Sequence, residues 1–242
     1  MRLSLACLAC LLPLSAPAQE APGFSLGLGV GLSDSPYIGE DDFEADVLPL
    51  INFRTERFEL GTGGASYDVI QNGPLVVDVF VAPRFSALED PDSDELDGID
   101  RDLTFDAGAG LGYAIRPGTR VTASVRTEIT DEHEGQELRL ALFQEVPNFP
   151  LRLGAGVSVQ SEELASYLYG VEEDEARPGR PAYDPDVVAV PFLSLNSRVP
   201  LRNNISLFAG ARMAFLPDEA TDSPIVEDDV VLSSNVGIAY RF

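Results

Sequence analysis

The chain has 242 residues, of which 45% are hydrophobic, and its mean hydropathy is +0.03. Beyond the N-terminus no stretch approaches the ~18 uninterrupted apolar residues of a membrane-spanning helix, so that class of membrane protein is excluded. The formal net charge is −24, and all 16 basic residues are arginines set against 40 acidic residues. Such a charge excludes nucleic acid as a partner and disfavours anionic surfaces.

The first 18 residues have the organisation of a secretory signal peptide. Arg2 supplies a positive charge, residues 3–14 form a short apolar core, and Ala16-Pro17-Ala18 is a small-x-small cleavage site. A buried first helix is the alternative, and the prolines in this segment disfavour it. We therefore expect residues 1–18 to be removed and residues 19–242 to form one domain. Both cysteines precede the cleavage site, so the exported chain would carry neither disulfides nor thiolate metal ligands.

Large apolar residues alternate with small or polar ones from the start of the exported chain, and a period of two predicts β-strands. The first two ladders are residues 24–32 and 44–54. Within the second, Pro49 would lose a ladder hydrogen bond in a central strand, which predicts a local bulge or break. The next segment, 57–70, is ambiguous between one broken strand and a short hairpin, because three glycines interrupt its pattern.

The same alternation continues to the end of the chain. Further strands are predicted at 75–81, 103–115, 120–129, 138–142, 151–159, 187–199, 205–215 and 230–242. The connections differ in length and charge. Short turns are expected at 116–119, 146–150 and 200–203, and long acidic loops at 87–101, 161–185 and 217–229. An outer-membrane barrel shows this asymmetry, with short turns in the periplasm and long loops outside.

The face opposite the apolar ladder is rich in Gly and Ser and also carries charges. The charged residues expected there are Asp102, Asp106, Arg120, Arg126, Glu128, Arg139, Arg152, Arg212 and Arg241. A soluble two-sheet sandwich would also alternate. The signal peptide and the final strand, which ends on the aromatic Phe242, favour a barrel closed within a membrane. We predict an all-β fold, a single transmembrane antiparallel up-and-down β-barrel of the Gram-negative outer membrane.

The strand count depends on residues 57–70. Counting 57–70 as one segment gives eleven, whereas a bacterial single-chain barrel with both termini in the periplasm needs an even number. Two short strands in 57–70 would give twelve, which we predict. Ten strands remain the alternative if part of that segment lies outside the barrel. The final strand is expected to pair with residues 24–32 and close the barrel.

Three groups of residues were considered as sites. His133, the only histidine, lies in an acidic hairpin tip, where we expect a solvated side chain on a mobile loop rather than a general base. Asp90, Asp92, Asp94, Asp97 and Asp100 suggest a calcium loop, but the glycine and glutamate that an EF-hand requires are missing, which leaves only a weak irregular site. Acidic outer loops of this kind would also share divalent cations with lipopolysaccharide phosphates.

The third group is the set of lumen charges, for which two interpretations stay open. They line a solute path, or they pair with one another and fill a narrow interior; mixed signs without a ring of one sign give no ion selectivity. The charges concerned are Arg120, Arg126, Arg152 and Arg212 with Asp106 and Glu128. We expect no catalytic, cofactor-binding or metal-binding residue and no cofactor.

Several short motifs, in the same order along nearly the whole exported chain, resemble the MipA/OmpV family, named for an MltA-interacting protein and an outer-membrane protein V. The motifs are Gly27–Tyr37 with Ile38-Gly39, Val47–Arg54, Gly98–Asp100, Tyr167–Val171 with Pro181–Tyr183, Asp222–Val226 and Gly237–Phe242. The chain departs from the family where Leu168 and Tyr169 replace a frequent Phe. The terminal Tyr-Arg-Phe is similar to the signal read by the barrel insertion machinery.

The resemblance implies a non-enzymatic scaffold of the envelope, linking a murein lytic transglycosylase to a murein synthase in contact with outer-membrane lipid and lipopolysaccharide. It transfers no catalytic residue. A small-solute channel and a surface adhesion or receptor barrel are the alternatives. A barrel enzyme is a further one, disfavoured by the single histidine on a loop.

Overall fold

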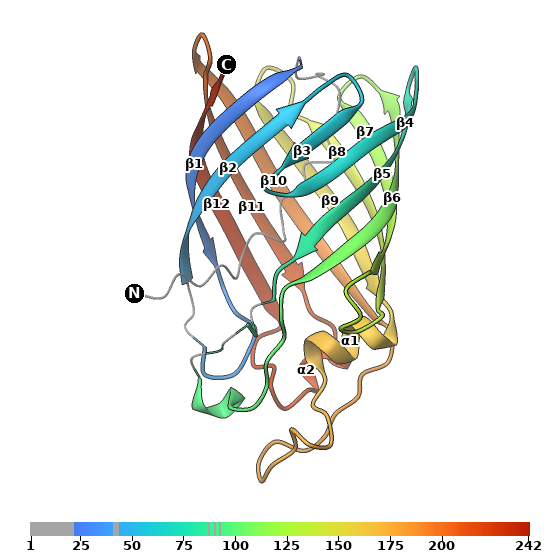
Figure 1. Ribbon diagram of the computed structural model, residues 1–242, viewed down its shortest axis with the longest axis vertical. Helices are drawn as coiled ribbons and strands as arrows, with labels where there is room; N and C mark the ends of the chain where they lie inside the picture. Colours follow the sequence, from blue (N-terminus) through green and yellow to red (C-terminus); the bar gives the residue numbers. More distant parts are fainter. Residues whose placement is uncertain (1–21, 41–43, 87, 90, 92) are drawn as a thin grey trace.

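The computed structural model describes residues 22–40, 44–86, 88–89, 91 and 93–242, and the predicted signal peptide lies outside them. Twelve antiparallel strands form a closed barrel in which each strand pairs with its neighbours in sequence and β12 pairs with β1 (Figure 1). This confirms the predicted all-β barrel and the count of twelve strands. None of the described helices is long and apolar enough to cross a membrane.

The strands are β1 (Gly23–Ser33), β2 (Glu44–Arg54), β3 (Phe58–Gly61), β4 (Gly64–Asn72), β5 (Leu75–Arg84), β6 (Thr104–Arg116), β7 (Thr119–Glu128), β8 (Gln136–Glu145), β9 (Leu151–Gln160), β10 (Val188–Arg202), β11 (Ile205–Phe215) and β12 (Val230–Arg241). The helices among the described residues are the 3-10 helix η2 (Asp94–Leu96) and the α-helices α1 (Glu162–Tyr169) and α2 (Asp218–Thr221). They lie in the long connections at one end of the barrel, the loop end (Figure 1). The short connections and Phe242 lie at the other, the turn end.

The barrel closes through β12 and β1, in which Leu26 pairs with Tyr240 and Val30 with Val236. At the turn end, the Phe242 N–H donates a 2.9 Å hydrogen bond to the carbonyl of Phe24, and the two rings lie 5.6 Å apart. The predicted closing strand is therefore confirmed. Closure leaves β12 without a free edge, as a membrane barrel requires.

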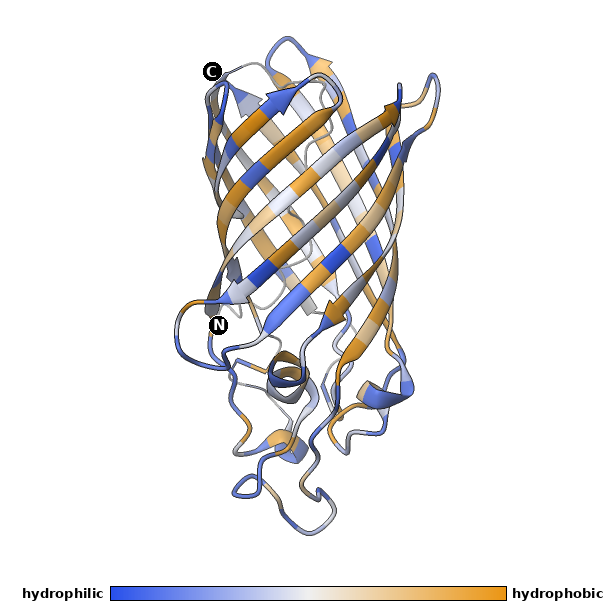
Figure 2. Ribbon diagram, turned by 90° about the vertical axis from the view of Figure 1, so that its right-hand side faces the viewer, coloured by the Kyte–Doolittle hydropathy of each residue, from blue (hydrophilic) through white to orange (hydrophobic). Residues whose placement is uncertain are grey.

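The outer surface of the barrel wall is apolar because every second side chain of the strands points outward. Figure 2 shows apolar residues recurring along the strands, whereas the loop end is mainly hydrophilic. The exposed apolar side chains include Leu28, Val47, Ile51, Val125, Leu140, Val236 and Ile238. In water this surface would be an aggregation hazard, whereas lipid solvates it.

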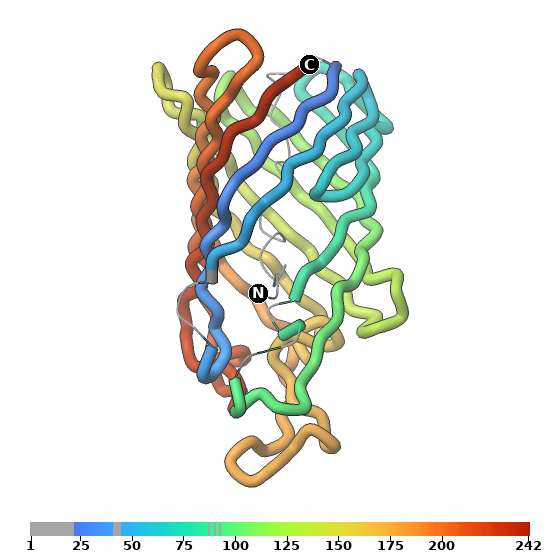
Figure 3. The backbone as a smooth tube through the Cα atoms, turned by 60° about the vertical axis from the view of Figure 1, so that its left-hand side comes forward, coloured from blue at the N-terminus to red at the C-terminus, as the bar shows by residue number. Residues whose placement is uncertain are grey.

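Residues 57–70 form a hairpin, β3–β4, that turns inside the wall instead of at the turn end or the loop end (Figure 3). Gly61 fits against β2, since a Cβ there would lie 2.6 Å from the carbonyl oxygen of Ile51. Gly64 has a φ of +113°, and a Cβ on it would collide with the carbonyl oxygen of Val81 in β5. The glycines that blurred the sequence pattern therefore make the early turn possible.

The predicted loop 161–185 contains an α-helix that its sequence signals had not led us to expect. The Ser161 hydroxyl accepts a 3.5 Å hydrogen bond from the Leu164 N–H, Glu162 and Glu163 occupy the first turn, and Gly170 ends the helix. These are a standard N-cap, acids that favour the positive end of the helix dipole, and a C-terminal glycine. Helix α1 buries Leu164, Ala165 and Tyr169 at the loop end of the barrel.

Candidate functional site: the capped lumen

An apolar cluster contributed by the long connections closes the loop end of the barrel. We call the described residues of the β1–β2, β5–β6, β9–β10 and β11–β12 connections the cap. Its buried members are Tyr37, Leu88, Leu96, Ile99, Ala165, Tyr169, Val171, Leu216, Ala220, Ile225 and Val226, which pack with Val188 and Val190 of the adjoining wall. The predicted acidic loops therefore have a folded core beneath their charged surface.

Buried polar groups in the cap have partners in other connections. The Tyr37 hydroxyl donates to the carbonyl of Leu168 at 2.9 Å, and the Ser223 hydroxyl donates to the carbonyl of Tyr169 at 2.6 Å. Burial raises the pKa of Tyr169 to about 12, so its phenol stays neutral. These bonds join three connections that are far apart in sequence, and they fix the cap as one unit.

A bidentate ion pair holds the outer part of the cap. Arg101 Nη1 and Nη2 lie 2.5 and 2.9 Å from the two carboxylate oxygens of Glu175, and Arg101 Nε donates to the carbonyl of Tyr167 at 3.0 Å. Burial opposes the charge on Glu175, but hydrogen bonds from Arg101 and from the Glu172 N–H outweigh it and lower the Glu175 pKa. Both charges are therefore retained within a largely buried pair.

Two arginines, Arg177 and Arg180, hold the backbone of the aspartate-rich loop. Arg180 donates to the carbonyls of Glu95 at 2.7 Å and Asp97 at 3.0 Å, and Arg177 donates to the carbonyl of Asp94 at 2.6 Å. Asp90 and Asp92 lie outside the described residues, while the side chains of Asp94, Asp97 and Asp100 are exposed. Across the described parts of the chain, no three His, Cys, Asp or Glu side chains gather to hold a metal.

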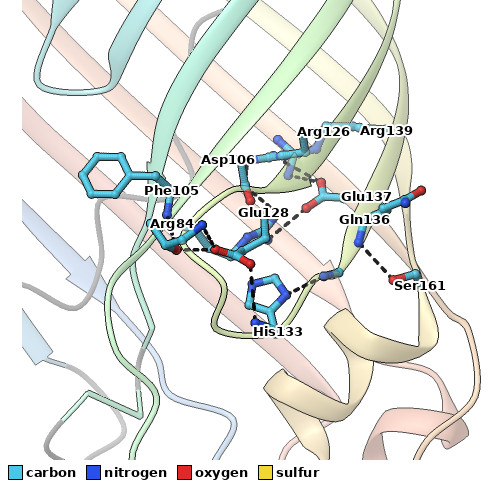
Figure 4. A network of polar contacts seen from close by, with 12 residues as sticks. Arg84, Phe105, Asp106, Arg126, Glu128, His133, Gln136, Glu137, Arg139 and Ser161 are labelled. Carbon is cyan, nitrogen blue, oxygen red and sulfur yellow. Dashed lines mark hydrogen bonds and ion pairs between the residues drawn. The ribbon is translucent and has the colours of Figure 1, made fainter.

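On the turn-end side of the cap, five charged side chains form an ion layer inside the barrel (Figure 4). Glu137 Oε1 lies 2.8 Å from Arg139 and 3.2 Å from Arg126, while its Oε2 lies 3.1 Å from Arg84. Asp106 Oδ2 is 2.8 Å from Arg84 and 3.4 Å from Arg126. Three guanidinium groups thus surround two carboxylates, which leaves a net charge of +1. Since Asp106 and Glu137 are 1% and 2% exposed, these charges neutralise one another away from bulk water.

The pairing interpretation of the lumen charges is therefore correct for Asp106 and Arg126. Elsewhere the lumen contacts differ: Arg212 lies 3.9 Å from the ring centroid of Phe192, and Arg152 approaches Glu145 at 3.9 Å. Arg120 is nearly buried against Gly112. The placement of Asp102 on the lumen face was wrong, because β6 begins only at Thr104 and the Asp102 side chain is exposed. Arg241 lies in β12 on the same face as Ala239, which lines the lumen cavity, so its strand position agrees with the prediction, although its side chain is exposed at the turn end.

Two members of the ion layer, Arg84 and Glu137, were missing from the charges expected in the lumen. Alternation would have placed Arg84 on the same face as Asp78 and Ala82, had the strand been extended past Pro83. Glu137 directly precedes the predicted strand 138–142 and had no predicted partner. Its three arginines come from β5, β7 and β8, a proximity that only barrel closure produces.

Glu128 anchors a loop instead of joining the ion layer. Its carboxylate accepts hydrogen bonds from the N–H and hydroxyl of Thr130 and, at 3.2 Å, from the N–H of Glu134 (Figure 4). Those contacts shape the 129–135 loop, in which Asp131 and Glu134 adopt positive φ. The interpretation of Glu128 as a lumen ion-pair partner was therefore wrong.

His133 is half-buried, so the expectation of a solvated side chain was wrong. Its Nδ1 accepts a 3.0 Å hydrogen bond from the Gly135 N–H, and its ring lies 4.4 Å from the ring of Tyr167. Burial, followed by the charge of Arg84, lowers the His133 pKa and favours the neutral imidazole. The ring joins the 129–135 loop to α1 and thus has a structural role.

Toward the turn end the lumen widens into a cavity of ≈ 1170 Å³. Its polar lining includes Asn52, the Arg54–Glu59 ion pair, Asn196 and Arg198, and its apolar lining includes Leu48, Leu50 and Phe80. The lumen is thus divided along its axis. A cavity occupies the turn end, whereas the ion layer and the cap occupy the loop end.

Comparisons with known proteins agree with this architecture. The family model described as "MltA-interacting protein MipA" matches residues 26–242. The chain is 31% identical to the "MltA-interacting protein" of Escherichia coli (strain K12), covering 100% of this chain and 99% of that protein. It is 27% identical to "Putative outer membrane protein YiaT" of the same strain, covering 96% and 95%, and 27% identical to "Outer membrane protein Omp26La" of Vibrio anguillarum, covering 85% and 76%.

Among solved structures, the "CymD monoaromatic hydrocarbon channel" is similar with a TM-score of 0.49 and 12% identity, covering 93% of this chain and 90% of that chain. The NanC porin has a TM-score of 0.47 and 7% identity, covering 90% and 100%. The family match spans the described barrel from β1 to the end of the chain, and relatives of nearly equal length are named outer-membrane proteins. The chain is an outer-membrane β-barrel and belongs to the family of the MltA-interacting protein MipA.

Proposed function

We propose that this protein is a non-enzymatic interaction barrel whose turn end binds a murein lytic transglycosylase and links it to a murein synthase. The observation that carries the proposal is the 31% identity, over the whole length of both chains, to a protein named for interacting with MltA. The ion layer and the cap support the proposal, because their charged and polar groups bind one another and fill the loop end of the lumen.

The turn end is the surface that a murein-processing partner would contact, since short turns face the periplasm in barrels of this class. Its exposed side chains include Phe149, which is 69% exposed at the tip of the β8–β9 turn. Aromatic side chains are among the residues that most often anchor protein interfaces. We therefore expect Phe149→Ser to weaken partner binding. Glu56→Ser, in the β2–β3 turn, is the matched control.

Co-purification tests the proposal. The tagged barrel is extracted in mild detergent from cells of the source bacterium, and bound proteins are identified by mass spectrometry against a tagged, unrelated outer-membrane barrel. Specific recovery of a lytic transglycosylase, reduced by Phe149→Ser but not by Glu56→Ser, is the expected result. Equal recovery with the unrelated barrel would remove the main support for a scaffold.

The cavity at the turn end favours a second candidate, a channel for small solutes. The ion layer and the cap argue against axial flow, because a permeating solute would have to separate buried ion pairs. Single-channel recording in planar bilayers distinguishes the two functions. A scaffold with a filled lumen gives no discrete conductance steps, and reproducible steps with the wild-type chain would establish the channel.

The acidic side chains of the cap are exposed at the loop end. We infer that exposed carboxylates such as Glu173 and Asp174 share divalent cations with the phosphate groups of lipopolysaccharide. The thermal unfolding temperature in lipopolysaccharide-containing bilayers should fall when a chelator is added. An unchanged temperature would reject this contact.

A further inference from the structure

Strand pairing in the barrel wall is interrupted between β2 and β5 on the loop-end side of the β3–β4 hairpin, which turns inside the wall (Figure 3). Strand β2 pairs with β3 only through residues 52–54, and β5 pairs with β4 only through residues 75–81. On the loop-end side of the hairpin, residues 45–50 of β2 and 82–84 of β5 form the two strand edges. Among the described residues, no strand pairs with either of these edges. We call this space, bounded above by residues 62–64, the wall slot.

The backbone shows that the edge of β2 is adapted to remain unpaired. The Thr62 N–H donates to the Ile51 carbonyl at 3.0 Å, and the Thr62 hydroxyl accepts from the Ile51 N–H and donates to the Pro49 carbonyl, both at 3.0 Å. Backbone groups two residues along a strand point to the same side. Pro49 therefore faces the wall slot and has no N–H to leave unsatisfied there.

The opposite edge has the same feature. Pro83 pairs with Phe105 of β6, but the Phe105 carbonyl accepts its hydrogen bond from Ile129, on the far side of β6. Pro83 and Phe105 are thus a non-hydrogen-bonded pair, and the backbone groups of Pro83 point toward the wall slot. A proline on each facing edge, at the position whose N–H would enter the gap, explains why neither edge recruits another strand.

Next to the hairpin, the side chains around the wall slot are apolar on both faces of the wall, whereas the charged Asp46 and Arg84 lie at its loop-end limit. Leu48 and Leu50 of β2 and Ala82 of β5 line the cavity, while Val47, Ile51 and Val81 are exposed on the membrane-facing side. Thr62, Gly63 and Gly64 line the same cavity from above. The cavity therefore reaches the wall slot, and unpaired backbone at membrane depth is tolerated where it borders such a cavity.

We propose that the acyl chain of a membrane lipid enters the lumen through the wall slot. The ion layer and the cap obstruct the lumen toward the loop end, so the route from the outer half of the membrane into the cavity is lateral. An acyl chain needs no backbone donors, whereas an added peptide strand would lack the two that Pro49 and Pro83 remove. The leucines of β2 offer that chain apolar surface inside the wall.

Site-directed fluorescence quenching tests the proposal. In a chain carrying Cys7→Ser and Cys10→Ser, single cysteines at Leu50, Ile51 or Asn196 are labelled with an environment-sensitive fluorophore. Leu50 faces the lumen at the wall slot, Ile51 faces lipid, and Asn196 faces the lumen from β10, where it is paired on both sides. Each variant is reconstituted in phosphatidylcholine vesicles with or without phospholipid that is spin-labelled on its acyl chain.

The label at Leu50→Cys should lose fluorescence to an extent comparable with the label at Ile51→Cys, while the label at Asn196→Cys keeps most of its signal. Protection of the Leu50→Cys label equal to that of Asn196→Cys would overturn the proposal; a peptide strand seated in the wall slot would give this result. Quenching of Leu50→Cys by a free spin-labelled fatty acid but not by the phospholipid would also contradict entry of a membrane lipid chain.

Discussion

Replacing Glu137 by Gln tests the ion layer most sharply. The substitution keeps the shape of the side chain but removes a carboxylate that lies 2.8 to 3.2 Å from three arginines. Asp106 alone would then face Arg84, Arg126 and Arg139, so the net charge of the layer rises from +1 to +2. Because Glu137 is only 2% exposed, the surplus charge is poorly solvated, and breaking such a buried pair costs about 3–5 kcal/mol.

The free energy of unfolding is measured by urea titration of the barrel refolded into lipid vesicles. The folded fraction is followed by circular dichroism and by heat-modifiable electrophoretic mobility, because the chain contains no tryptophan. Glu145→Gln is the matched control: its carboxylate is 51% exposed and 3.9 Å from Arg152, so about 0–1 kcal/mol should be lost. A loss at Glu137 as small as that at Glu145 would refute the buried ion layer.

Three further predictions concern the cap and the hairpin. Arg101→Lys should accelerate amide exchange in the 171–183 part of the cap several-fold, because a lysine cannot form the bidentate pair with Glu175; unchanged exchange would refute the role of the pair. The depressed Glu175 pKa means that its stabilisation is complete above the ordinary Glu value of ~4.3 and is lost as pH falls through the depressed value. Exchange in that segment, corrected for intrinsic rates, should rise in this acidic range in wild type but not in Glu175→Gln. Gly64→Ala should reduce the urea unfolding free energy by more than the ~1–2 kcal/mol expected for Gly73→Ala, which has a positive φ but open space around its Cβ; equal losses would contradict the close fit of the hairpin.

The barrel wall was predictable because lipid imposes a simple rule on each strand. Outward side chains such as Leu28 and Val236 must be apolar, and inward ones such as Gly29 and Gly237 must be small or polar, so each strand carries its own signal. The bulge or break predicted at Pro49 was wrong, because β2 runs unbroken through Pro49 in continuous register with β1, and the lost N–H lies on the strand's other edge, at the wall slot. The hairpin at 57–70 followed from strand parity rather than from local pattern.

The cap was not predictable, because its contacts join segments that only barrel closure brings together. Arg101 and Glu175 lie 74 residues apart, and Tyr37 bonds to a carbonyl 131 residues away. No local pattern specifies such pairs. The capping signals of α1 at Ser161 and Gly170 were readable in principle, but the acidic composition around them favoured the interpretation as a loop.

The functional inference was limited in the same way. The lumen charges showed which residues face inward, but not which carboxylate each arginine meets. Asp106 and Arg126 were identified together, whereas Arg84 was missed because alternation was not followed past Pro83. The family membership came from motifs spread along the chain rather than from any chemical site.

Binding of a purified murein lytic transglycosylase to the barrel in nanodiscs tests the central claim most directly. Biolayer interferometry with the barrel immobilised by a tag in its loop-end cap leaves the turn end free for the partner. We predict saturable binding to the wild type, weaker binding to Phe149→Ser, and unchanged binding to Glu56→Ser. Equal binding to nanodiscs that carry an unrelated outer-membrane barrel would contradict the account. So would the absence of binding to the wild-type barrel.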